Sequence, residues 1–414
     1  MTAGHAPAAS SGASEQSLSL FQLMYPDVLA DPYPLYERLR TTDPVHWDPF
    51  LHTWVVTRYE DVDFVLKHFS AARTPTPDQL TELGLSGLNV VAEILVRQML
   101  FLDGRAHARV RNLAASAFTR SRVLRLRSHI EDITRSLLDA VIEKREMDVI
   151  ADLGDPLPAI VTAELLGLPT SDWPQLTAWS TQFAEVLGNL QHNPDHTARV
   201  LRTIDEVTDY FRRAVAEHRA HPGDDLICAF LNARQDGDSL TEDEVIANSI
   251  IVMTGGQETT TNLIGNGVLN LLSHPDQWEL IKRDPRGLAL AIEELLRFDG
   301  PIQYTSRLAP KDLELGGRRI QERQAVIAVI AAANRDPSRF SDPDRLDLTR
   351  NDNRHLAFAS GPHSCFGAPL ARLEADVVFS ALLTRTPDLA LKDAPRNWIE
   401  NVGFRGLTSL PVTF

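Results

Sequence analysis

The sequence predicts a single large domain that is mainly α with a minor β portion. Apolar residues recur at helical spacing through nearly all of residues 103–295. Short β-type runs stand at 45–57, around 313–330 and at 407–414. After residue 20 no linker rich in Gly, Ser or Pro, no charge block and no internal repeat divides the chain, and 43% of its residues are apolar, which is enough for one core.

The N-terminal part begins with residues 1–19, which are small and polar. They contain neither the basic cluster nor the apolar stretch of a secretory signal, so we expect a disordered lead-in. Residues 70–100 mix Pro, Thr, Gly and Leu, which predicts a long, partly helical connection of the kind that often forms a binding loop. Between these segments the predicted elements are a helix over 31–40, strands at 45–47 and 54–57, and a helix near 61–67.

The longest predicted helix follows a capping box, Thr241-Glu-Asp-Glu244, and runs to His274, where Pro275 stops it. About 32 residues give it a length of about 48 Å, enough to cross the molecule. Its centre, Met253-Thr-Gly-Gly-Gln-Glu-Thr-Thr-Thr-Asn262, is rich in poor helix formers. A sequence that breaks local rules in this way usually does so for function.

The residues of this helix centre alone allow two interpretations of its role. Gly255 and Gly256 leave space for a ligand beside the helix, and Glu258 and Thr259 could deliver protons to that ligand. The alternative is a glycine-mediated helix crossing in which the hydroxyl groups bond to the helix backbone.

A glycine-bounded loop, Phe358-Ala-Ser-Gly-Pro-His-Ser-Cys-Phe-Gly367, places Cys365 directly before an amphipathic helix. The free N–H groups and dipole of a helix N-terminus favour a thiolate, so we expect a lowered pKa for Cys365. Gly361 and Gly367 permit positive φ and a close approach to a flat partner. A thiolate held in this way is a good axial ligand for haem iron.

Other roles for Cys365 are possible from its neighbours. A lone cysteine is most often a small buried hydrophobe, and His363 could act as a base for a nucleophilic cysteine. Zinc is disfavoured because the other cysteine, Cys228, stands 137 positions away and no ligand cluster forms.

The spacing F-x-x-G-x-H-x-C-x-G in this loop resembles the haem-ligand loop of the cytochrome P450 family. The segment beginning at Gly255 is similar to the family's oxygen-activation motif, [Ala/Gly]-Gly-x-[Asp/Glu]-Thr, and the resemblance extends over residues 20–414. It implies the cytochrome P450 fold, a haem b cofactor and Cys365 as the ligand of its iron. It further implies that Thr259 hydrogen-bonds the activated oxygen and that Glu258 gates proton delivery.

The resemblance also assigns residues that hold the haem. Its propionates call for cationic donors, which the family takes from a His-x-x-x-Arg pair, a later arginine and the histidine before the cysteine. In this sequence the implied cofactor-binding residues are His107, Arg111, Gly255, Arg307, Phe358, Gly361, His363, Cys365 and Gly367.

Glu294 and Arg297 resemble the family's structural Glu-x-x-Arg pair, and we expect them to bind an arginine of the later irregular segment. The best candidate is Arg345 in Pro343-Asp-Arg-Leu346. Departures from the family pattern are small. They are Gly104 and Arg105 in place of a common Pro-Pro pair, Arg323 where a turn glycine is common, and Ala359 in place of a usual glycine.

By resemblance the substrate pocket is mostly apolar, and its expected lining is Val91, Ile94, Phe183, Thr254, Gln303 and Thr305. The expected reaction is hydroxylation or epoxidation of an apolar organic substrate, such as a secondary metabolite, with O₂. The open alternatives are oxidative C–C coupling, peroxide-driven oxidation and a non-enzymatic haem sensor.

The net charge of −15 argues against binding of nucleic acid or an anionic membrane. Two cysteines and no apolar run of membrane-spanning length predict a soluble, cytoplasmic protein, and we expect a monomer. Residues 105–127 are an exception to this negative charge, because they contain seven arginines and no acidic residue. We interpret this stretch as a dock for a ferredoxin or flavodoxin-type electron donor served by an NAD(P)H reductase, with a solvated helix face as the alternative.

Overall fold

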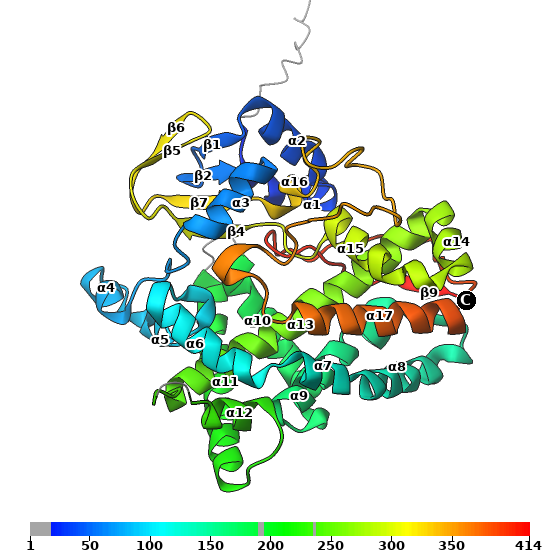
Figure 1. The fold of residues 1–414 in the computed structure, drawn as a ribbon, viewed down its shortest axis with the longest axis horizontal. Coiled ribbons are helices and arrows are strands. Elements are labelled where there is room, and N and C mark those ends of the chain that lie inside the picture. Colours follow the sequence, from blue (N-terminus) through cyan, green and yellow to red (C-terminus); the bar gives the residue numbers. More distant parts are fainter. Residues whose placement is uncertain (1–17, 189–193, 235–236) are drawn as a thin grey trace, which may run out of the picture.

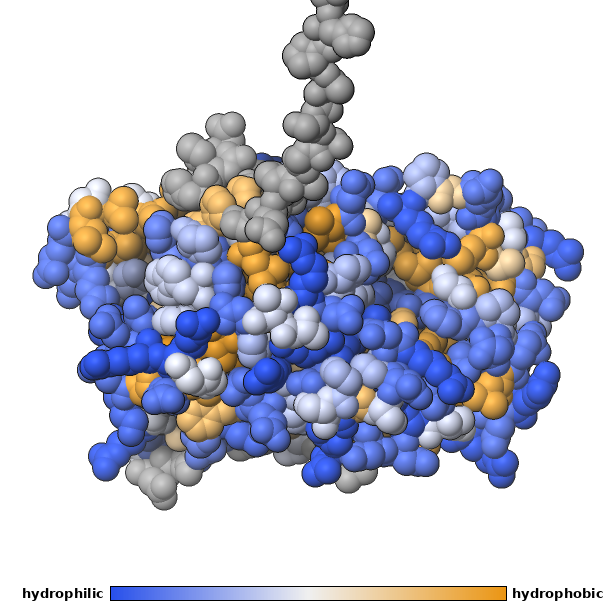
Figure 2. All heavy atoms as spheres, turned by 90° about the horizontal axis from the view of Figure 1, so that it is seen from above, coloured by the Kyte–Doolittle hydropathy of each residue, from blue (hydrophilic) through white to orange (hydrophobic). Residues whose placement is uncertain are grey.

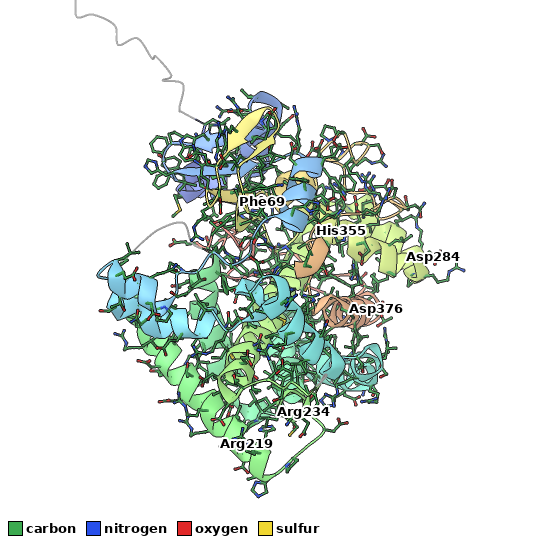
Figure 3. The ribbon with its side chains drawn as sticks, turned by 60° about the vertical axis from the view of Figure 1, so that its left-hand side comes forward. Phe69, Arg219, Arg234, Asp284, His355 and Asp376 are labelled. Carbon is green, nitrogen blue, oxygen red and sulfur yellow. The ribbon has the colours of Figure 1, made fainter. Side chains whose placement is uncertain are left out.

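The computed structural model describes residues 18–188, 194–234 and 237–414. Figure 1 shows a sheet-containing part, formed by the N-terminal chain and residues 305–333, above a larger helical part arranged around α13. Figure 3 gives a second view, with Phe69 in the sheet-containing part and Arg219 and Arg234 at the opposite, all-helical end. The predicted fold, mainly α with a minor β portion, is confirmed.

Helices form most of the described chain. Their bounds are α1 (Pro26–Ala30), α2 (Tyr33–Thr42), α3 (Tyr59–His68), α4 (Pro77–Glu82), α5 (Asn89–Leu95), α6 (Gly104–Ala117), α7 (Arg120–Arg125), α8 (Arg127–Ile142), α9 (Pro156–Leu166), α10 (Trp173–Gly188), α11 (Pro194–Ala220), α12 (Leu226–Asn232), α13 (Glu242–Ser273), α14 (Pro275–Arg283), α15 (Leu288–Asp299), α16 (Ile330–Ala333) and α17 (Ala368–Arg385). The helices predicted near 31–40 and 61–67 correspond to α2 and α3.

The strands form three small sheets. Their bounds are β1 (Val45–Asp48), β2 (Thr53–Val56), β3 (Glu146–Asp148), β4 (Thr305–Leu308), β5 (Leu313–Leu315), β6 (Arg318–Ile320), β7 (Ala325–Ala328), β8 (Ala390–Leu391) and β9 (Pro411–Thr413). The sheet orders are β1-β2-β7-β4, β3-β9-β8 and β5-β6. Among the described strands only the β2–β7 pairing is parallel, with Trp54 opposite Val326. Sequence reasoning missed β4, and it wrongly included β3 in a helical region.

The N-terminal boundary also needs a correction. Residues 1–17 of the expected lead-in lie outside the described residues, but Ser19 belongs to the fold. Its side chain is buried, and its hydroxyl donates to the carboxylate of Asp48 at 2.9 Å. Because Ser19 also accepts from the N–H of Phe21, it caps the first helical turn.

Helix α13 is the central element. Its predicted capping box is present: the Thr241 hydroxyl accepts from the N–H of Glu244 at 3.2 Å, and the Thr241 N–H donates to the Glu244 carboxylate at 2.8 Å. The helix packs against α9, α10, α11, α15 and α17, so most of its side chains are buried. This burial carries the glycines and threonines of its centre into the middle of the molecule.

The surface is largely hydrophilic in the view of Figure 2, and hydrophobic residues gather there only in small groups. Within the three described ranges, no helix combines the length and the hydropathy that a bilayer-spanning segment requires.

Candidate active site

A cavity of about 320 Å³ separates the centre of α13 from the Cys365 loop. One wall is the stretch of α13 that contains both glycines and Thr259, and the opposite wall is the loop from Phe358 to Gly367. The remaining walls are mostly apolar side chains of distant elements, among them Met99, Leu100, Phe118, Leu165, Leu187 and Phe404. The fold thus brings together the two motifs that the sequence keeps over 100 residues apart.

The Cys365 thiol faces this cavity, and the loop backbone fixes its position. The Cys365 N–H donates to the carbonyl of Phe358 at 2.8 Å, closing the loop on itself. The Cys365 thiol is exposed to the open cavity, yet desolvation by the protein atoms packed around it raises its pKa, although the N–H groups of Gly367 and Ala368 oppose this effect. The expectation of a lowered pKa is therefore wrong for the metal-free thiol, because desolvation outweighs the helix N-terminus. A cation in the cavity would favour the thiolate.

The conformation of the loop explains one of its two glycines. Gly361 has φ +74°, and a Cβ there would lie 2.9 Å from the Cα of Lys67 on α3. Gly367 has φ −83° as the residue before α17, so the expected positive φ is not found there. Ala359 adopts φ +55°, a left-handed conformation that the more usual glycine would adopt without strain.

The α13 wall opens beside Gly255, where an added Cβ would meet no atom within 4 Å. At Gly256 the same Cβ would lie 2.8 Å from the hydroxyl of Thr162 on α9. Thr259 lines the cavity, and its hydroxyl donates to the Gly255 carbonyl at 2.8 Å. Both readings of the helix centre thus hold in part: Gly256 permits a helix crossing, and Gly255 leaves room for a ligand.

Glu258 stands beside this wall and accepts a hydrogen bond from the Thr181 hydroxyl of α10 at 3.2 Å. Burial raises the pKa of Glu258 to about 7, and the nearby carboxylate of Asp155 adds to the shift. Burial likewise raises the pKa of Asp155 to about 6. Glu258 can therefore hold or release a proton near neutral pH, as a general acid must.

Cationic and imidazole side chains gather at the cavity edge next to the Cys365 loop. The rings of His107 and His363 stack with centroids 4.0 Å apart. Arg111 donates to the Ser364 carbonyl of the loop at 2.7 Å, and Arg307 donates to the Thr305 hydroxyl at 2.9 Å. Two buried nitrogen atoms, Nε of Arg307 and Nε2 of His107, have no hydrogen-bond partner among the described residues.

Sequence reasoning missed a further member of this cluster, Arg73. Its guanidinium lies 4.5 Å from the ring centroid of Phe101 and lines the same cavity. Burial, with repulsion from Arg307, lowers the pKa of Arg73 to about 9. The run Ala71-Ala-Arg-Thr-Pro75 has no pattern that indicates burial or a cavity, so no signal in the sequence pointed to Arg73.

The charges of this cluster do not balance within the protein. Burial lowers the pKa of His107 and that of His363, the latter to about 4, so both imidazoles are neutral at pH 7. Arg73, Arg111 and Arg307 carry three positive charges. Among the described residues, the carboxylate of Asp103 acts on Arg73 and Arg307, and no carboxylate acts on Arg111. Two positive charges remain, and a ligand with two negative charges would balance them.

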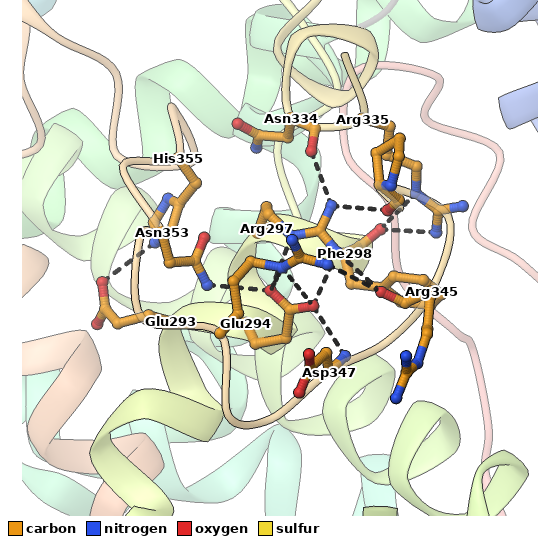
Figure 4. Close-up of polar contacts among 12 residues, drawn as sticks. Glu293, Glu294, Arg297, Phe298, Asn334, Arg335, Arg345, Asp347, Asn353 and His355 are labelled. Carbon is orange, nitrogen blue, oxygen red and sulfur yellow. Dashed lines mark hydrogen bonds and ion pairs between the residues drawn. The ribbon is translucent and has the colours of Figure 1, made fainter. Parts of the chain in front are cut away.

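The predicted pair of Glu294 and Arg297 is fully buried (Figure 4). Arg297 donates to both carboxylate oxygens of Glu294, at 2.7 and 2.8 Å. The third member is not the side chain of Arg345, which points away from Glu294 and is exposed. Arg345 contributes only its backbone carbonyl, which accepts a hydrogen bond from Arg297 at 3.3 Å. Arg350 takes that place instead, with its Nε 3.1 and 3.2 Å from the Glu294 oxygens. The Arg345 assignment is therefore corrected.

The expected substrate residues divide into two groups. Thr254 and Thr305 line the cavity. The other four are not among its described lining residues: Phe183 and Ile94 are buried in the hydrophobic core, Val91 packs against that core, and Gln303 bonds to Tyr36 and Gly300. Their assignment to the pocket wall is therefore wrong for this conformation.

Comparison with known proteins agrees with this architecture. The sequence matches the family described as Cytochrome P450 over residues 51–283 and 288–386. It is 39% identical over 370 residues to cytochrome P450 CYP107DY1 of Priestia megaterium, covering 87% of this chain and 89% of that protein. It is 37% identical to the cytochrome P450 monooxygenase PikC of Streptomyces venezuelae, covering 93% and 92%.

A crystal structure of P450BioI in complex with an acyl carrier protein ligated to hexadec-9Z-enoic acid has a similar fold. Its TM-score is 0.87 at 35% identity, with 94% of this chain and 99% of that chain covered.

The cavity fits the haem b of this family. The two unbalanced positive charges match its two propionates, and the unpartnered donors of His107 and Arg307 lie where those groups need hydrogen bonds. The Cys365 thiol and the open space beside Gly255 lie on opposite walls of the cavity. The sequence match, the fold and the fit of the cavity to haem show that the chain belongs to the cytochrome P450 family of haem-containing monooxygenases.

Proposed function

We propose that this protein hydroxylates or epoxidises an apolar organic substrate, such as a secondary metabolite, with O₂ and electrons from a ferredoxin- or flavodoxin-type donor. The observation that carries the proposal is the apolar cavity with Cys365 on one wall and Thr259, beside Glu258, on the other. The hexadecenoic acid bound in the P450BioI complex is an apolar chain, which agrees with such a substrate class.

In this proposal each residue has a defined task. Haem, when bound, supplies the one-electron chemistry that activates O₂. Cys365 would bind the haem iron through its thiolate, and His107, Arg111, Arg307 and His363 would hold the propionates, with Arg73 as an added cation. Thr259 donates a hydrogen bond on the substrate side, and Glu258 delivers protons to it.

The test is turnover of a compound that shifts the haem spectrum on binding. We expect product with ferredoxin, reductase, NAD(P)H and O₂, and almost none with hydrogen peroxide alone. Turnover by peroxide alone would favour the peroxygenase alternative, and coupled dimers without added oxygen would favour C–C coupling. The absence of any turnover together with retained haem would favour a sensor, for which Glu258 and Thr259 would have no task.

Thr259→Ala should retain haem and substrate binding but divert electrons to hydrogen peroxide. The substitution removes the hydroxyl that controls proton delivery. General acid–base catalysis typically contributes about 10²-fold or more, so product per NAD(P)H should fall by at least about tenfold. The measurement is product and peroxide formed per NAD(P)H consumed. Thr177→Ala on α10 is the control, because within the described ranges the Thr177 hydroxyl bonds only to the Trp173 carbonyl. Unchanged coupling in Thr259→Ala would refute the assignment.

The coupling efficiency should also depend on pH through Glu258. Because burial raises the pKa of its carboxyl to about 7, Glu258 carries a proton below that pH and loses it above. Product per NAD(P)H should therefore decline as the pH rises from 6 to 8. Glu258→Gln should have lower coupling at pH 6 and no such decline, which is measured with the same assay across that pH range.

The electron-donor dock needs a revision within the stretch 105–127. Within this stretch the expected docking residues are Arg109, Arg120 and Arg122. Arg109 pairs with Glu244 and Arg122 pairs with Asp224, so the charges of these two arginines are neutralised. The side chain of Arg120 lies outside the described residues. Arg125 is exposed on α7, which packs against α17, and it forms no ion pair within the described ranges. It becomes the best candidate for the dock.

Arg125→Glu should slow reduction by an acidic ferredoxin at low salt, and raising the salt should slow the wild-type reaction as well. Complementary charges mainly raise association rates, and they are screened over about 8 Å at physiological ionic strength. Arg38→Glu makes the same charge change on an exposed residue of α2, in the sheet-containing part of the molecule, and is the control (Figure 1). Stopped-flow reduction rates that respond equally to both variants would support the solvated-face alternative.

A further inference from the structure

Asp103 stands at the N-terminus of α6, but its side chain makes no hydrogen bond to this helix. Aspartate at such a position usually accepts a backbone N–H from the first turn. Asp225 does so before α12, where its carboxylate accepts from the N–H of Cys228 at 2.8 Å. A residue that gives up its local role usually serves another one, and the actual partners of the Asp103 carboxylate indicate which.

These partners are three consecutive residues that follow α3, 31–33 positions earlier in the chain. The carboxylate accepts from the Ser70 hydroxyl, from the N–H of Ala71 at 3.1 Å and from the N–H of Ala72 at 3.2 Å. The Ala71 carbonyl in turn accepts from the Arg73 guanidinium at 3.3 Å. Asp103 therefore fixes the backbone from which Arg73 reaches the active-site cavity.

Asp103 also connects the elements that carry the haem-edge cluster, by which we mean the side chains proposed to hold the propionates: Arg73, His107, Arg111, Arg307 and His363. Its Oδ1 atom lies 3.5 Å from Nε2 of His363. Ser70 forms two backbone hydrogen bonds of 2.9 Å with Leu308, the residue that follows Arg307 in β4. The two remaining members of the cluster lie on α6, which begins directly after Asp103. One carboxylate thus joins all the segments from which the cluster is built.

The charge of Asp103 reaches most of this cluster as well. Among the described residues it is the one carboxylate that acts electrostatically on four members, namely Arg73, His107, Arg307 and His363. Although burial opposes the effect, hydrogen bonds from residues 70–72 lower the pKa of Asp103, so the carboxylate is ionised at neutral pH. Its side chain is 36% exposed, and water therefore screens part of the interaction.

We propose that Asp103 is a positioning residue that orients the haem-edge cluster toward the propionates, and that its negative charge lowers the reduction potential of the bound haem. The inference rests on the proposed role of this cluster in holding the propionates. The hydrogen bonds to residues 70–72 and the contact with His363 fix two segments of the cluster. The charge disfavours reduction because the electron that enters the haem adds negative charge to the same site.

The first measurement is the reduction potential of the haem in the substrate-free holoenzyme, determined by a spectroelectrochemical titration. Asp103→Asn removes the charge but keeps an amide that can bond to residues 70–72. The equilibrium constant for reduction should rise about twofold to fivefold, as expected for a partly exposed charge. For a one-electron couple this rise is an upward shift of about 20–40 mV.

Asp284→Asn is the matched control for the loss of charge. Asp284 likewise precedes a helical turn, which it caps by accepting the N–H of Arg286 at 3.2 Å, and its side chain is 53% exposed. It lies at the outer edge of the molecule in Figure 3, so its substitution should leave the potential unchanged. An unchanged potential in Asp103→Asn, or an equal rise in both variants, would overturn the proposal.

The second measurement is the rate of haem transfer from the holoenzyme to apomyoglobin. Ser70→Ala removes one hydrogen bond of Asp103 but keeps its charge. Haem loss should become about threefold to tenfold faster, the effect of one hydrogen bond, while the reduction potential stays at the wild-type value. Asp103→Asn should both lose haem faster and have the higher potential. Ser171→Ala, at an exposed serine, is the control. Haem loss at the wild-type rate from Ser70→Ala and from Asp103→Asn would contradict the positioning role.

These measurements need no turnover, so they separate the role of Asp103 from the proposed function. If the wild type forms product but the variants match it in potential and haem retention, the role of Asp103 is refuted and the monooxygenase function stands. If the wild type holds haem but forms no product while the variants differ as expected, the proposed function is refuted and the role of Asp103 stands. Asp103→Ser, which suits a helix N-terminus, replaces Asp103→Asn if that variant folds poorly, and it should show the same rise in potential.

Discussion

Cys365→Ser should abolish monooxygenase activity and change the haem spectrum. The proposed axial ligand is a thiolate, which favours O–O cleavage by donating electron density, and a serine hydroxyl cannot replace it. Reduced wild-type protein under CO should show the red-shifted Soret band of thiolate ligation, and Cys365→Ser should lack it. Without a thiolate to favour O–O cleavage, turnover should fall to background.

Cys228→Ser is the matched control, since Cys228 is the only other cysteine of the chain. Its sulfur accepts the N–H of Gly223 at 3.1 Å, a contact that a serine hydroxyl can also make. The variant should keep the thiolate-type CO spectrum and its activity. An imidazole-type CO spectrum in folded wild-type protein, or a thiolate-type spectrum in Cys365→Ser, would remove Cys365 from the iron site.

The sequence predicted the parts of the fold that local signals determine. The Thr241 capping box and Pro275 marked both ends of α13 to within a residue. The strand β4 escaped notice because its segment, Thr-Ser-Arg-Leu308, is short and polar and is stabilised by pairing with β7 rather than by its own pattern. Strand β3 depends in the same way on β9, which lies more than 260 positions later.

The site was predictable where a motif spans a few residues, and less so where distant segments meet. Arg345 and Arg350 lie five residues apart in the same irregular segment, and only the three-dimensional path decides which side chain reaches Glu294. Arg73 became visible as a cavity residue only once the structure placed it beside Arg307. The pKa of Cys365 was mistaken because desolvation by the surrounding protein atoms, which a sequence does not display, outweighs the helix N-terminus.

Glu294→Ala should be the most destabilising of the substitutions considered. Glu294 accepts hydrogen bonds from Arg297, Arg350, Asn353 and the N–H of Asp347, and its side chain is fully buried. Its removal leaves the Arg297 guanidinium buried without a counter-charge, and breaking a buried ion pair typically costs about 3–5 kcal/mol. Urea unfolding followed by haem absorbance and circular dichroism measures the change.

The surface pair of Glu279 and Lys282 is the control for this effect. Its two side chains are 48% and 25% exposed, and exposed pairs contribute about 0–1 kcal/mol. Glu279→Ala should therefore change the free energy of unfolding by less than about 1 kcal/mol. A similar small change for Glu294→Ala would mean that water or a rearranged side chain compensates Arg297.

Arg350→Ala and Arg345→Ala separate the two candidate partners of Glu294. The Arg350 side chain is 9% exposed, bonds to both Glu294 oxygens and donates to the Ser341 carbonyl at 2.8 Å. The loss of Arg350 removes hydrogen bonds from the buried Glu294 carboxylate and should lower the free energy of unfolding by about 2–3 kcal/mol. Arg345 offers only its backbone carbonyl, which alanine retains, so Arg345→Ala should change stability by less than about 0.5 kcal/mol. The reverse order would restore the assignment that the sequence suggested and would show that the Glu294 site is held by Arg345 in solution.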